Sequence, residues 1–136
     1  MTHPADFHMF RPAIEAWGER GHETIIAARD KDITRDLIAA RGWDALPIGT
    51  QGRGTVGLAR EMLDRQRKLW RVIRRTRPDV VTSMSGAYVG PPAWLRGVPC
   101  VAWTDTEHAV LQNRIGFAVS RAVVTPACYT GHVPPA

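Results

Sequence analysis

The alternation of short apolar runs with longer amphipathic stretches is the feature that most constrains the fold of this chain. Apolar side chains recur every three or four positions in the longer stretches, which is the period of a helix. Helices are predicted at residues 7–20, 33–41, 58–77 and 109–119, with a further one after a turn at 85–86 that ends near residue 97. Strands are predicted at residues 23–28, 45–48, 79–84, 98–103 and 122–125. This order predicts an α/β domain with a parallel sheet covered by helices on both faces.

The composition excludes several classes of protein. An apolar fraction of 44% over 136 residues is enough for one domain with a core. Cys100 and Cys128 form neither a zinc-binding pattern nor a disulfide framework, which fits a reducing compartment. No dinucleotide, P-loop or nucleophile-elbow motif is present, so we expect no metal and no cofactor. The sequence has no signal peptide and no apolar stretch near ~20 residues, so we expect a cytoplasmic protein.

Polar residues at the carboxyl ends of the predicted strands are the first candidates for a site, because parallel α/β sheets bind ligands there. Asp105, Glu107 and His108 directly follow the strand predicted at 98–103. Carboxylates and imidazoles can be tuned towards neutral pH, so Glu107 or His108 is the predicted acid/base group and Asp105 a third catalytic candidate. The structural alternative is that these side chains only cap or brace the helix that follows.

Two other strand ends are candidate substrate contacts. Ser85 and Gly86 follow the strand at 79–84, and small residues there let a ligand approach the backbone. Arg29 follows the strand at 23–28 and could contact an anionic ligand. Both places are also compatible with plain strand-to-helix turns, in which Asp30 or Asp32 caps the next helix.

The stretch HPADFH opens the first helix and contains two histidines, His3 and His8. A helix N-terminus presents free N–H groups and positive potential, which suit a phosphate or sugar hydroxyl. His3 and His8 are therefore predicted to bind substrate, with His8 contacting the acceptor or a phosphate. In the structural alternative, Asp6 is the N-cap and His8 a surface residue.

The predicted helix at residues 58–77 carries most of the net charge. It has eight basic and two acidic residues, a net of +6 in a chain whose total is +5. Such a face is predicted to meet anionic lipid head groups at the edge of a membrane, and a solvated surface helix is the alternative. Nucleic acid is not expected as a partner, because only Trp70 stands near the charge.

Five segments of the sequence gain meaning when they are taken together: HPADFHMFRPAIEAWGERGHE, TIIAARDKDITRDLIAARG, RPDVVTSMSG, GVPCVAWTDTEHA and NRIGFAVSRAVVTP. Their combination resembles a prokaryotic family of unknown function, domain of unknown function family 354. That family is placed among the GT-B glycosyltransferases and the UDP-N-acetylglucosamine 2-epimerases. The resemblance covers residues 3–126. It implies a Rossmann-like N-terminal domain at residues 1–126 and a tail or the start of an interdomain linker at residues 127–136.

The chain also departs from the family pattern. The family usually reads Asp-Asp-Thr-Glu-His where this chain has Thr104 in the first position. Family members begin with an apolar strand before the HP segment, whereas only Met1 and Thr2 precede His3 here. They continue into a second Rossmann-like domain that binds most of the nucleotide-sugar. The resemblance thus implies an acceptor-side half that lacks its first strand and is inactive alone, with a nucleotide-sugar and a glycan or lipid-linked acceptor as partners.

Three interpretations of the function compete. The chain is half of a glycosyltransferase or sugar-nucleotide epimerase, a standalone ligand-binding or regulatory domain without catalysis, or a nucleic-acid-binding domain that uses the basic helix. The first predicts turnover only with a C-terminal domain, and the second predicts ligand binding by the isolated chain. In the first, one cleft should be surrounded by six of the candidates, because the carboxyl ends of parallel strands share one edge of the sheet: His3, His8, Ser85, Asp105, Glu107 and His108.

Overall fold

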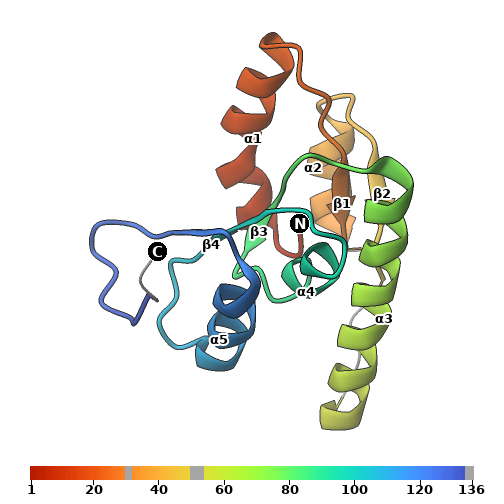
Figure 1. Ribbon diagram of the computed structural model, residues 1–136. Helices are drawn as coiled ribbons and strands as arrows, with labels where there is room; N and C mark the ends of the chain where they lie inside the picture. Colours follow the sequence, from red (N-terminus) through yellow and green to blue (C-terminus); the bar gives the residue numbers. More distant parts are fainter. Residues whose placement is uncertain (30–31, 50–53, 134–136) are drawn as a thin grey trace. The chain divides into compact units, whose positions relative to one another are not determined.

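The computed structural model describes residues 1–29, 32–49 and 54–133, and Figure 1 shows the order of the elements. Residue contacts divide the chain into two compact units, Met1–Glu61 and Met62–Ala136. Three predicted segments lie wholly or partly outside the described residues: the polar turn at 30–31, the loop at 50–53 and the end of the tail at 134–136. Among the described residues, no helix is both long and apolar enough to span a bilayer.

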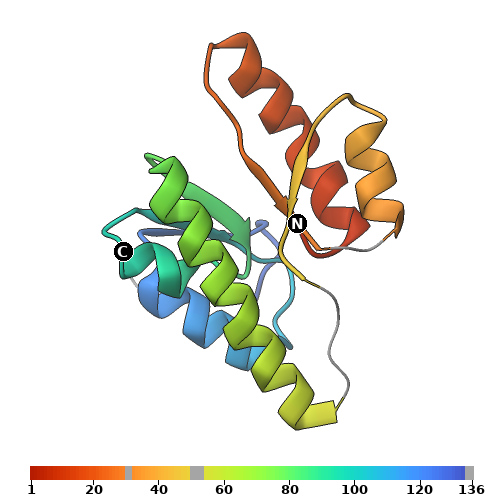
Figure 2. The ribbon, with the colours of Figure 1, turned by 90° about the vertical axis from the view of Figure 1, so that its right-hand side faces the viewer.

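The first unit contains a short parallel strand pair and two helices. Strand β1 (Ile26–Ala28) pairs with β2 (Ala45–Pro47), with Ile26 opposite Ala45. Helix α1 (Pro4–Glu19) packs against α2 (Asp32–Ala39), as Figure 2 shows. The buried apolar side chains of this unit are Phe7, Phe10, Ile14, Ile26, Ala28, Ile38 and Ile48. Three of them recur at helical spacing along α1, so one stripe of that helix is buried.

The backbone of Met1 lies alongside β1. The Met1 amino group donates to the Ala27 carbonyl, and the Arg29 N–H donates to the Met1 carbonyl at 2.9 Å. The Ala28 carbonyl accepts from Ile48 beyond the end of β2, at 3.0 Å. Because alternate residues of a parallel strand bond to opposite sides, Met1 occupies the side of β1 away from β2.

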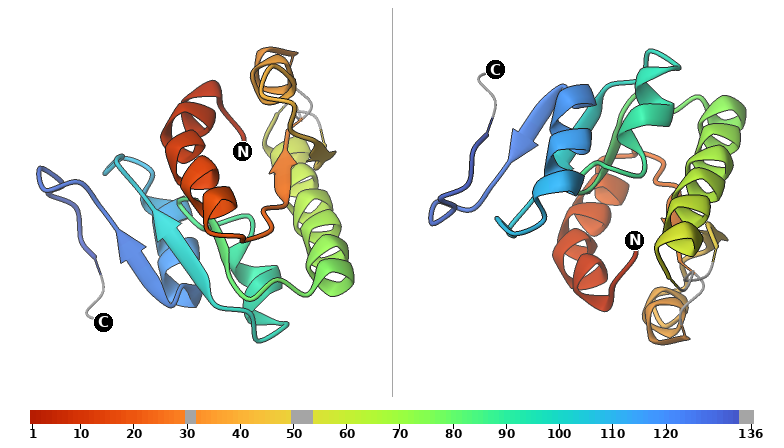
Figure 3. Two further views of the ribbon diagram at one scale, coloured as in Figure 1. Left: turned by 90° about the horizontal axis from the view of Figure 1, so that it is seen from above. Right: turned by 90° about the horizontal axis from the view of Figure 1, so that it is seen from below.

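The second unit is built on a three-stranded parallel sheet. Strands β3 (Val81–Met84), β4 (Cys100–Trp103) and β5 (Ala122–Val124) lie in the order β3-β4-β5. Helices α4 (Gly90–Trp94) and α5 (Val110–Val119) contact each other and β4, and Figure 3 shows them beside the sheet. Every second residue of β4 is buried, at Cys100 and Ala102, which is the alternation of a strand with one covered face.

Helix α3 (Gly54–Thr76) is the longest helix and crosses the boundary between the units. It ends where Arg77 adopts a left-handed conformation, with φ of 46°, immediately before Pro78. It begins at Gly54, four residues before the predicted start at residue 58. Glycines at 54 and 57 have low helix propensity, and this hid the first turn of the helix.

The predicted fold class is confirmed, because every described strand pairs in parallel and helices flank the strands. The predicted strands were longer than the observed ones. Predicted strand 23–28 retains only its last three residues, and the first two residues of predicted strands 79–84 and 98–103 lie outside β3 and β4. Apolar residues such as Ile25 and Val80 extended these predictions, although both side chains are exposed.

Candidate functional site

The best-formed candidate site is the loop at residues 104–108, which we call the site loop, directly after β4. Thr104 is buried, and its backbone N–H donates to the Val124 carbonyl of β5 at 3.1 Å. Its hydroxyl donates to Asn113 Oδ1 at 3.2 Å and lies 3.4 Å from the Thr106 N–H, which donates to it. Thr104 therefore begins the loop as a buried anchor, in the position where the family pattern has its first aspartate.

The three predicted catalytic residues of the site loop have different surroundings. Asp105 and His108 are exposed, whereas Glu107 is half-buried. Asp105 Oδ1 accepts from the Thr106 hydroxyl at 2.9 Å. Helix α5 has Ala109 as its N-cap and no side-chain capping bond, so the alternative in which Asp105 caps that helix is wrong.

Glu107 is held from two directions. Its Oε1 atom accepts the backbone N–H of Thr130 at 3.2 Å. Its own backbone N–H, then that of Thr130, lower the pKa of the Glu107 carboxyl, and the charge of His108 adds to this. Slight desolvation and the neighbouring Asp105 oppose the shift. Glu107 is therefore a carboxylate at neutral pH, which suits it to accept hydrogen bonds or to stabilise a neighbouring positive charge rather than to act as a general acid.

Ser85 and Gly86 form a tight turn at the end of β3. Both residues have positive φ, 55° for Ser85 and 72° for Gly86, and the Ser85 N–H donates to the Trp103 carbonyl at 2.6 Å. This bond joins the turn to the residue just before the site loop. Helix α5 approaches so closely that a Cβ at Gly116 would lie 1.7 Å from the Ser85 carbonyl oxygen. The turn is thus fixed by backbone contact on both sides, and glycine is required where the helix touches it.

Asn113 organises this region, and sequence reasoning missed it. The side chain is buried, with 5% exposed, and its amide nitrogen donates to the Thr106 carbonyl at 2.9 Å and to the Tyr129 hydroxyl at 3.3 Å. The available signal was its spacing. Asn113 stands three and four residues before Gly116 and Phe117, so it belongs to the buried face of its helix, where a polar residue needs partners.

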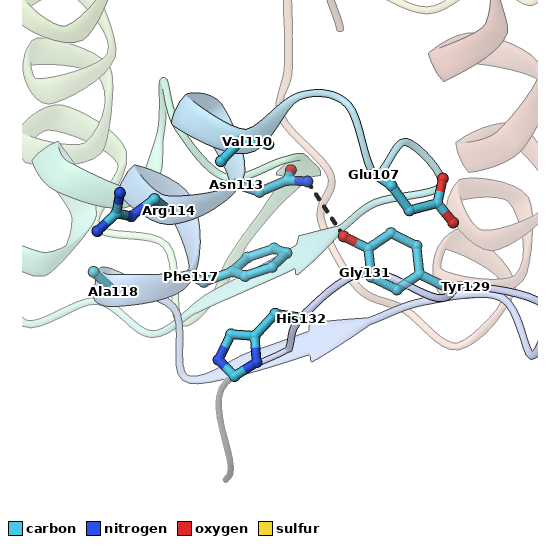
Figure 4. Close-up of a pocket in the computed structure, with 9 residues that line it drawn as sticks. All are labelled: Glu107, Val110, Asn113, Arg114, Phe117, Ala118, Tyr129, Gly131 and His132. Atoms are coloured by element: carbon cyan, nitrogen blue, oxygen red, sulfur yellow. Dashed lines mark hydrogen bonds between the residues drawn. The ribbon is translucent and has the colours of Figure 1, made fainter.

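A pocket of about 370 Å³ adjoins the site loop. Its lining residues come from the loop, from α5 and from the segment after β5, and Figure 4 draws them: Glu107, Val110, Asn113, Arg114, Phe117, Ala118, Tyr129, Gly131 and His132. The Phe117 and Tyr129 rings lie in the middle of the view, with Arg114 to the left and His132 below Phe117. The pocket therefore combines an apolar wall with two basic side chains. Sequence reasoning did not include any of its residues except Glu107.

The first unit holds the remaining predicted residues. His3 is the N-cap of α1, and its Nδ1 atom accepts the Ala5 N–H at 3.2 Å. Asp6 is buried one turn into the helix and accepts from the Thr2 N–H at 2.6 Å, from the Thr2 hydroxyl and from the His3 N–H. The alternative with Asp6 as N-cap is therefore wrong: the two side chains form a capping box with His3 as the cap.

His8 and Arg29 show no such network. His8 is exposed and meets the Phe7 ring edge-on, with 5.4 Å between ring centroids. Arg29 is half-buried and its backbone N–H pairs with Met1. The structure brings Ser85 and the site loop together through Trp103. The single cleft predicted to include His3 and His8 as well stays a prediction, and so does the contact of Arg29 with substrate. Within the described part of the chain, no group of three His, Cys, Asp or Glu side chains could hold a metal ion.

The basic side chains of α3 do not share one environment. The arginines at 67, 71, 74 and 75 are exposed, and Arg74 lies over the Trp70 ring with 5.0 Å to its centroid. Arg65 is buried with 2% exposed, and it lies 4.4 Å from the centre of the Tyr88 ring. The sequence analysis counted Arg65 among the charges of one exposed helix face. In the structure Arg65 is buried inside the second unit, so it does not contribute to that face.

Comparison with known proteins places this architecture. The family described as "Protein of unknown function (DUF354)" matches residues 1–131. The chain belongs to this family. It is 35% identical over 113 residues to the UDP-N-acetylglucosamine--N-acetylmuramyl-(pentapeptide) pyrophosphoryl-undecaprenol N-acetylglucosamine transferase of Anaeromyxobacter dehalogenans strain 2CP-C. The enzyme of the same name from strain 2CP-1 is 34% identical over 113 residues. Each match covers 76% of this chain but 30% of the relative.

A solved structure shows the same fold. The crystal structure of Acinetobacter baumannii MurG matches with a TM-score of 0.72 at 17% sequence identity, covering 89% of this chain and 37% of that chain. The predicted membership of the GT-B glycosyltransferase-like superfamily is thus confirmed. This DUF354 chain spans about a third of the length of the transferases it matches.

Proposed function

We propose that this DUF354 chain is the acceptor-side half of a glycosyltransferase that uses a nucleotide-sugar and a lipid-linked or cell-envelope glycan acceptor, and that it is inactive alone. This proposal rests on the 35% identity, over 76% of this chain, to a pyrophosphoryl-undecaprenol N-acetylglucosamine transferase. The position of the site loop supports it, because ligands of parallel α/β folds bind at the carboxyl ends of strands.

The chemistry proposed for the site loop is proton transfer. When an acceptor hydroxyl attacks the anomeric carbon, the bond from that carbon to the nucleotide diphosphate breaks and the hydroxyl must lose its proton. His108, exposed beside the Glu107 carboxylate, is proposed to accept that proton, with Glu107 or Asp105 as the alternative base. His3, His8, Arg29, Ser85 and Gly86 are proposed to contact the acceptor or its phosphates, as the sequence predicted.

Two variants test this assignment in a full-length family member that carries both halves and the same loop. Glu107→Gln and His108→Ala, at the equivalent positions, should each lower sugar transfer by about 10²-fold or more, as removal of a general base does. Release of the nucleoside diphosphate and of free sugar is measured in parallel. If both variants keep their activity and lose only thermal stability, the residues are structural and the catalytic proposal fails.

The isolated chain separates the competing functions. Mixed with UDP-N-acetylglucosamine, it should release no UDP, whereas a fusion to the C-terminal part of an Anaeromyxobacter relative should. Saturable ligand binding without turnover in the fusion would instead favour a standalone binding domain. Conversion of the sugar to its 2-epimer, with no transfer, would favour the epimerase alternative.

We also propose contact with the inner face of the membrane through α3. The exposed arginines at 67, 71, 74 and 75 supply charge, and Trp94 and Leu95 at the end of α4 are 64% and 68% exposed. Arginines attract anionic lipids at about 1 kcal/mol each near the surface. The chain should therefore sediment with vesicles containing phosphatidylglycerol at low salt and be released as the salt concentration rises.

A matched pair of variants tests the membrane proposal. Replacing Arg67, Arg71 and Arg74 by Gln should abolish sedimentation, whereas Arg114→Gln with Arg121→Gln, also exposed arginines, should leave it nearly unchanged. Equal binding to neutral phosphatidylcholine vesicles would contradict the proposal. Tighter binding to duplex DNA than to vesicles would favour a nucleic-acid function instead.

A further inference from the structure

The amide of Asn113 can satisfy its neighbours in only one orientation. The Thr106 carbonyl can only accept a hydrogen bond, so the nitrogen must face it at 2.9 Å. The oxygen then faces the Thr104 hydroxyl, which donates at 3.2 Å. The second N–H of the amide points to the Tyr129 hydroxyl at 3.3 Å. One buried side chain thus fixes two points of the site loop and one point of the segment that follows β5.

That segment, residues 126–133, is folded back onto the site loop, and we call it the latch. The Tyr129 N–H donates to the Pro126 carbonyl at 3.0 Å, which makes a turn, and the next N–H, that of Thr130, donates to Glu107. A Cβ at Gly131 would lie 2.5 Å from the Tyr129 hydroxyl, so only glycine lets the backbone pass so close to that ring. The Tyr129 hydroxyl is therefore enclosed between Asn113 and the latch itself.

We propose that Asn113 is a positioning residue that couples the latch to the site loop: by holding Tyr129 it seats the Thr130 N–H on the Glu107 carboxylate. The catalytic meaning of Glu107 rests on the proposed function, whereas the coupling rests only on the contacts. If the latch moves away, Glu107 loses the Thr130 N–H as a hydrogen-bond donor. A change in the position of the latch therefore changes the hydrogen bonding of the site loop.

The Glu107 carboxyl reports the coupling directly. The charges that act on it are those of Asp105 and His108 on its own loop, and the other titratable residues of the same pocket are Arg114 on α5 and Tyr129 and His132 on the latch. The Thr130 N–H favours the charged form and lowers the pKa of Glu107. When the latch is released, that pKa should rise towards the ordinary value of 4.5.

The decisive variant is Tyr129→Phe, which keeps the ring and removes only the hydroxyl. In the full chain, carbon-13 NMR titration of the Glu107 carboxyl should show its pKa raised, and exchange of the Thr130 amide hydrogen should be about tenfold faster, the loss of roughly one hydrogen bond. Tyr88→Phe is the matched control, because Tyr88 contacts Arg65 through its ring, and it should leave both readouts unchanged.

Asn113→Leu sharpens the test. Leucine has nearly the size of asparagine but no hydrogen-bonding group, so it loses the bonds to the Thr106 carbonyl and to the Tyr129 hydroxyl. Its effect on Glu107 should equal or exceed that of Tyr129→Phe, and the double variant should add nothing to Asn113→Leu alone.

The outcomes are distinct. An unchanged Glu107 titration and unchanged Thr130 exchange in Tyr129→Phe overturn the coupling, whether or not Asn113→Leu folds. Additive effects in the double variant also overturn it, because they show that the two residues act independently. Neither readout needs a substrate, so a negative sugar-transfer assay would overturn the proposed function and leave this coupling standing.

Discussion

The chain has two polar clusters in front of helices, and they use their side chains in opposite ways. At the start of α1, His3 and Asp6 bond to backbone groups within four residues of themselves, and so complete the N-terminus of their own helix. At the start of α5, the N-cap Ala109 has no side-chain bond, and the site loop is held by Asn113, Tyr129 and Thr130.

This difference separates a structural cluster from a candidate for chemistry. In the first cluster, helix capping accounts for the hydrogen bonds of both His3 and Asp6. In the second, remote residues supply the support, and Asp105 and His108 remain exposed at a strand end.

The support of the second cluster should be the more costly to disturb. Gly116→Ala places a methyl group 1.7 Å from the Ser85 carbonyl, so the turn or α5 must move, and we expect a loss of about 3 kcal/mol or more in unfolding free energy. Gly18→Ala in α1 is the matched control. Nothing lies within 4 Å of its Cβ, and the change should stabilise the helix by up to ~1 kcal/mol. Urea unfolding measures both, and equal stability of the two variants would contradict the close approach.

Asp6→Ala should come next in size. The buried carboxylate accepts three hydrogen bonds from Thr2 and His3, and its removal leaves backbone donors unpaired, which should cost about 2 kcal/mol. Asp44→Ala, at an exposed position of the same unit, should change stability by less than ~0.5 kcal/mol. A small effect at both positions would mean that the first cluster is not held by capping.

The same contrast explains which parts of the structure could be predicted from the sequence. Helical periodicity and short apolar runs predicted all ten elements, because each of these signals is local. The first cluster was within reach for the same reason, although the cap was assigned to Asp6 rather than His3. The role of Asn113 was not within reach, because Tyr129 lies sixteen residues away and only the fold brings it close. The pocket beside Glu107 was missed for the same reason.

His3 allows a smaller test of the first cluster. His3→Ala removes the side-chain acceptor for the Ala5 N–H and should cost about 1 kcal/mol, whereas His3→Ser restores a standard cap and should recover most of that loss. Thermal unfolding near neutral pH measures both variants. If serine fails to recover the stability, His3 contributes something other than a cap, and its proposed role in substrate binding gains support.

The smallest effect should come from Glu107, and it has a defined sign. Its pKa is lowered in the folded chain, first by its own backbone N–H and then by that of Thr130. A carboxyl with a lowered pKa contributes stability that is fully present above its unfolded value, 4.5, and that is lost as the pH falls through the folded value. Glu107→Gln should therefore flatten the dependence of unfolding free energy on pH below the unfolded value of 4.5 and leave the slope at higher pH unchanged. Because the half-buried side chain stays in contact with solvent, the change in slope should be small, and urea unfolding at closely spaced pH values is needed to resolve it.

Tyr129→Phe should fall between the wild type and Glu107→Gln, since it releases Thr130 but keeps the carboxyl. A curve for Tyr129→Phe that coincides with the wild type would show that the site loop holds Glu107 by itself, as α1 holds Asp6, and the contrast between the two clusters would disappear.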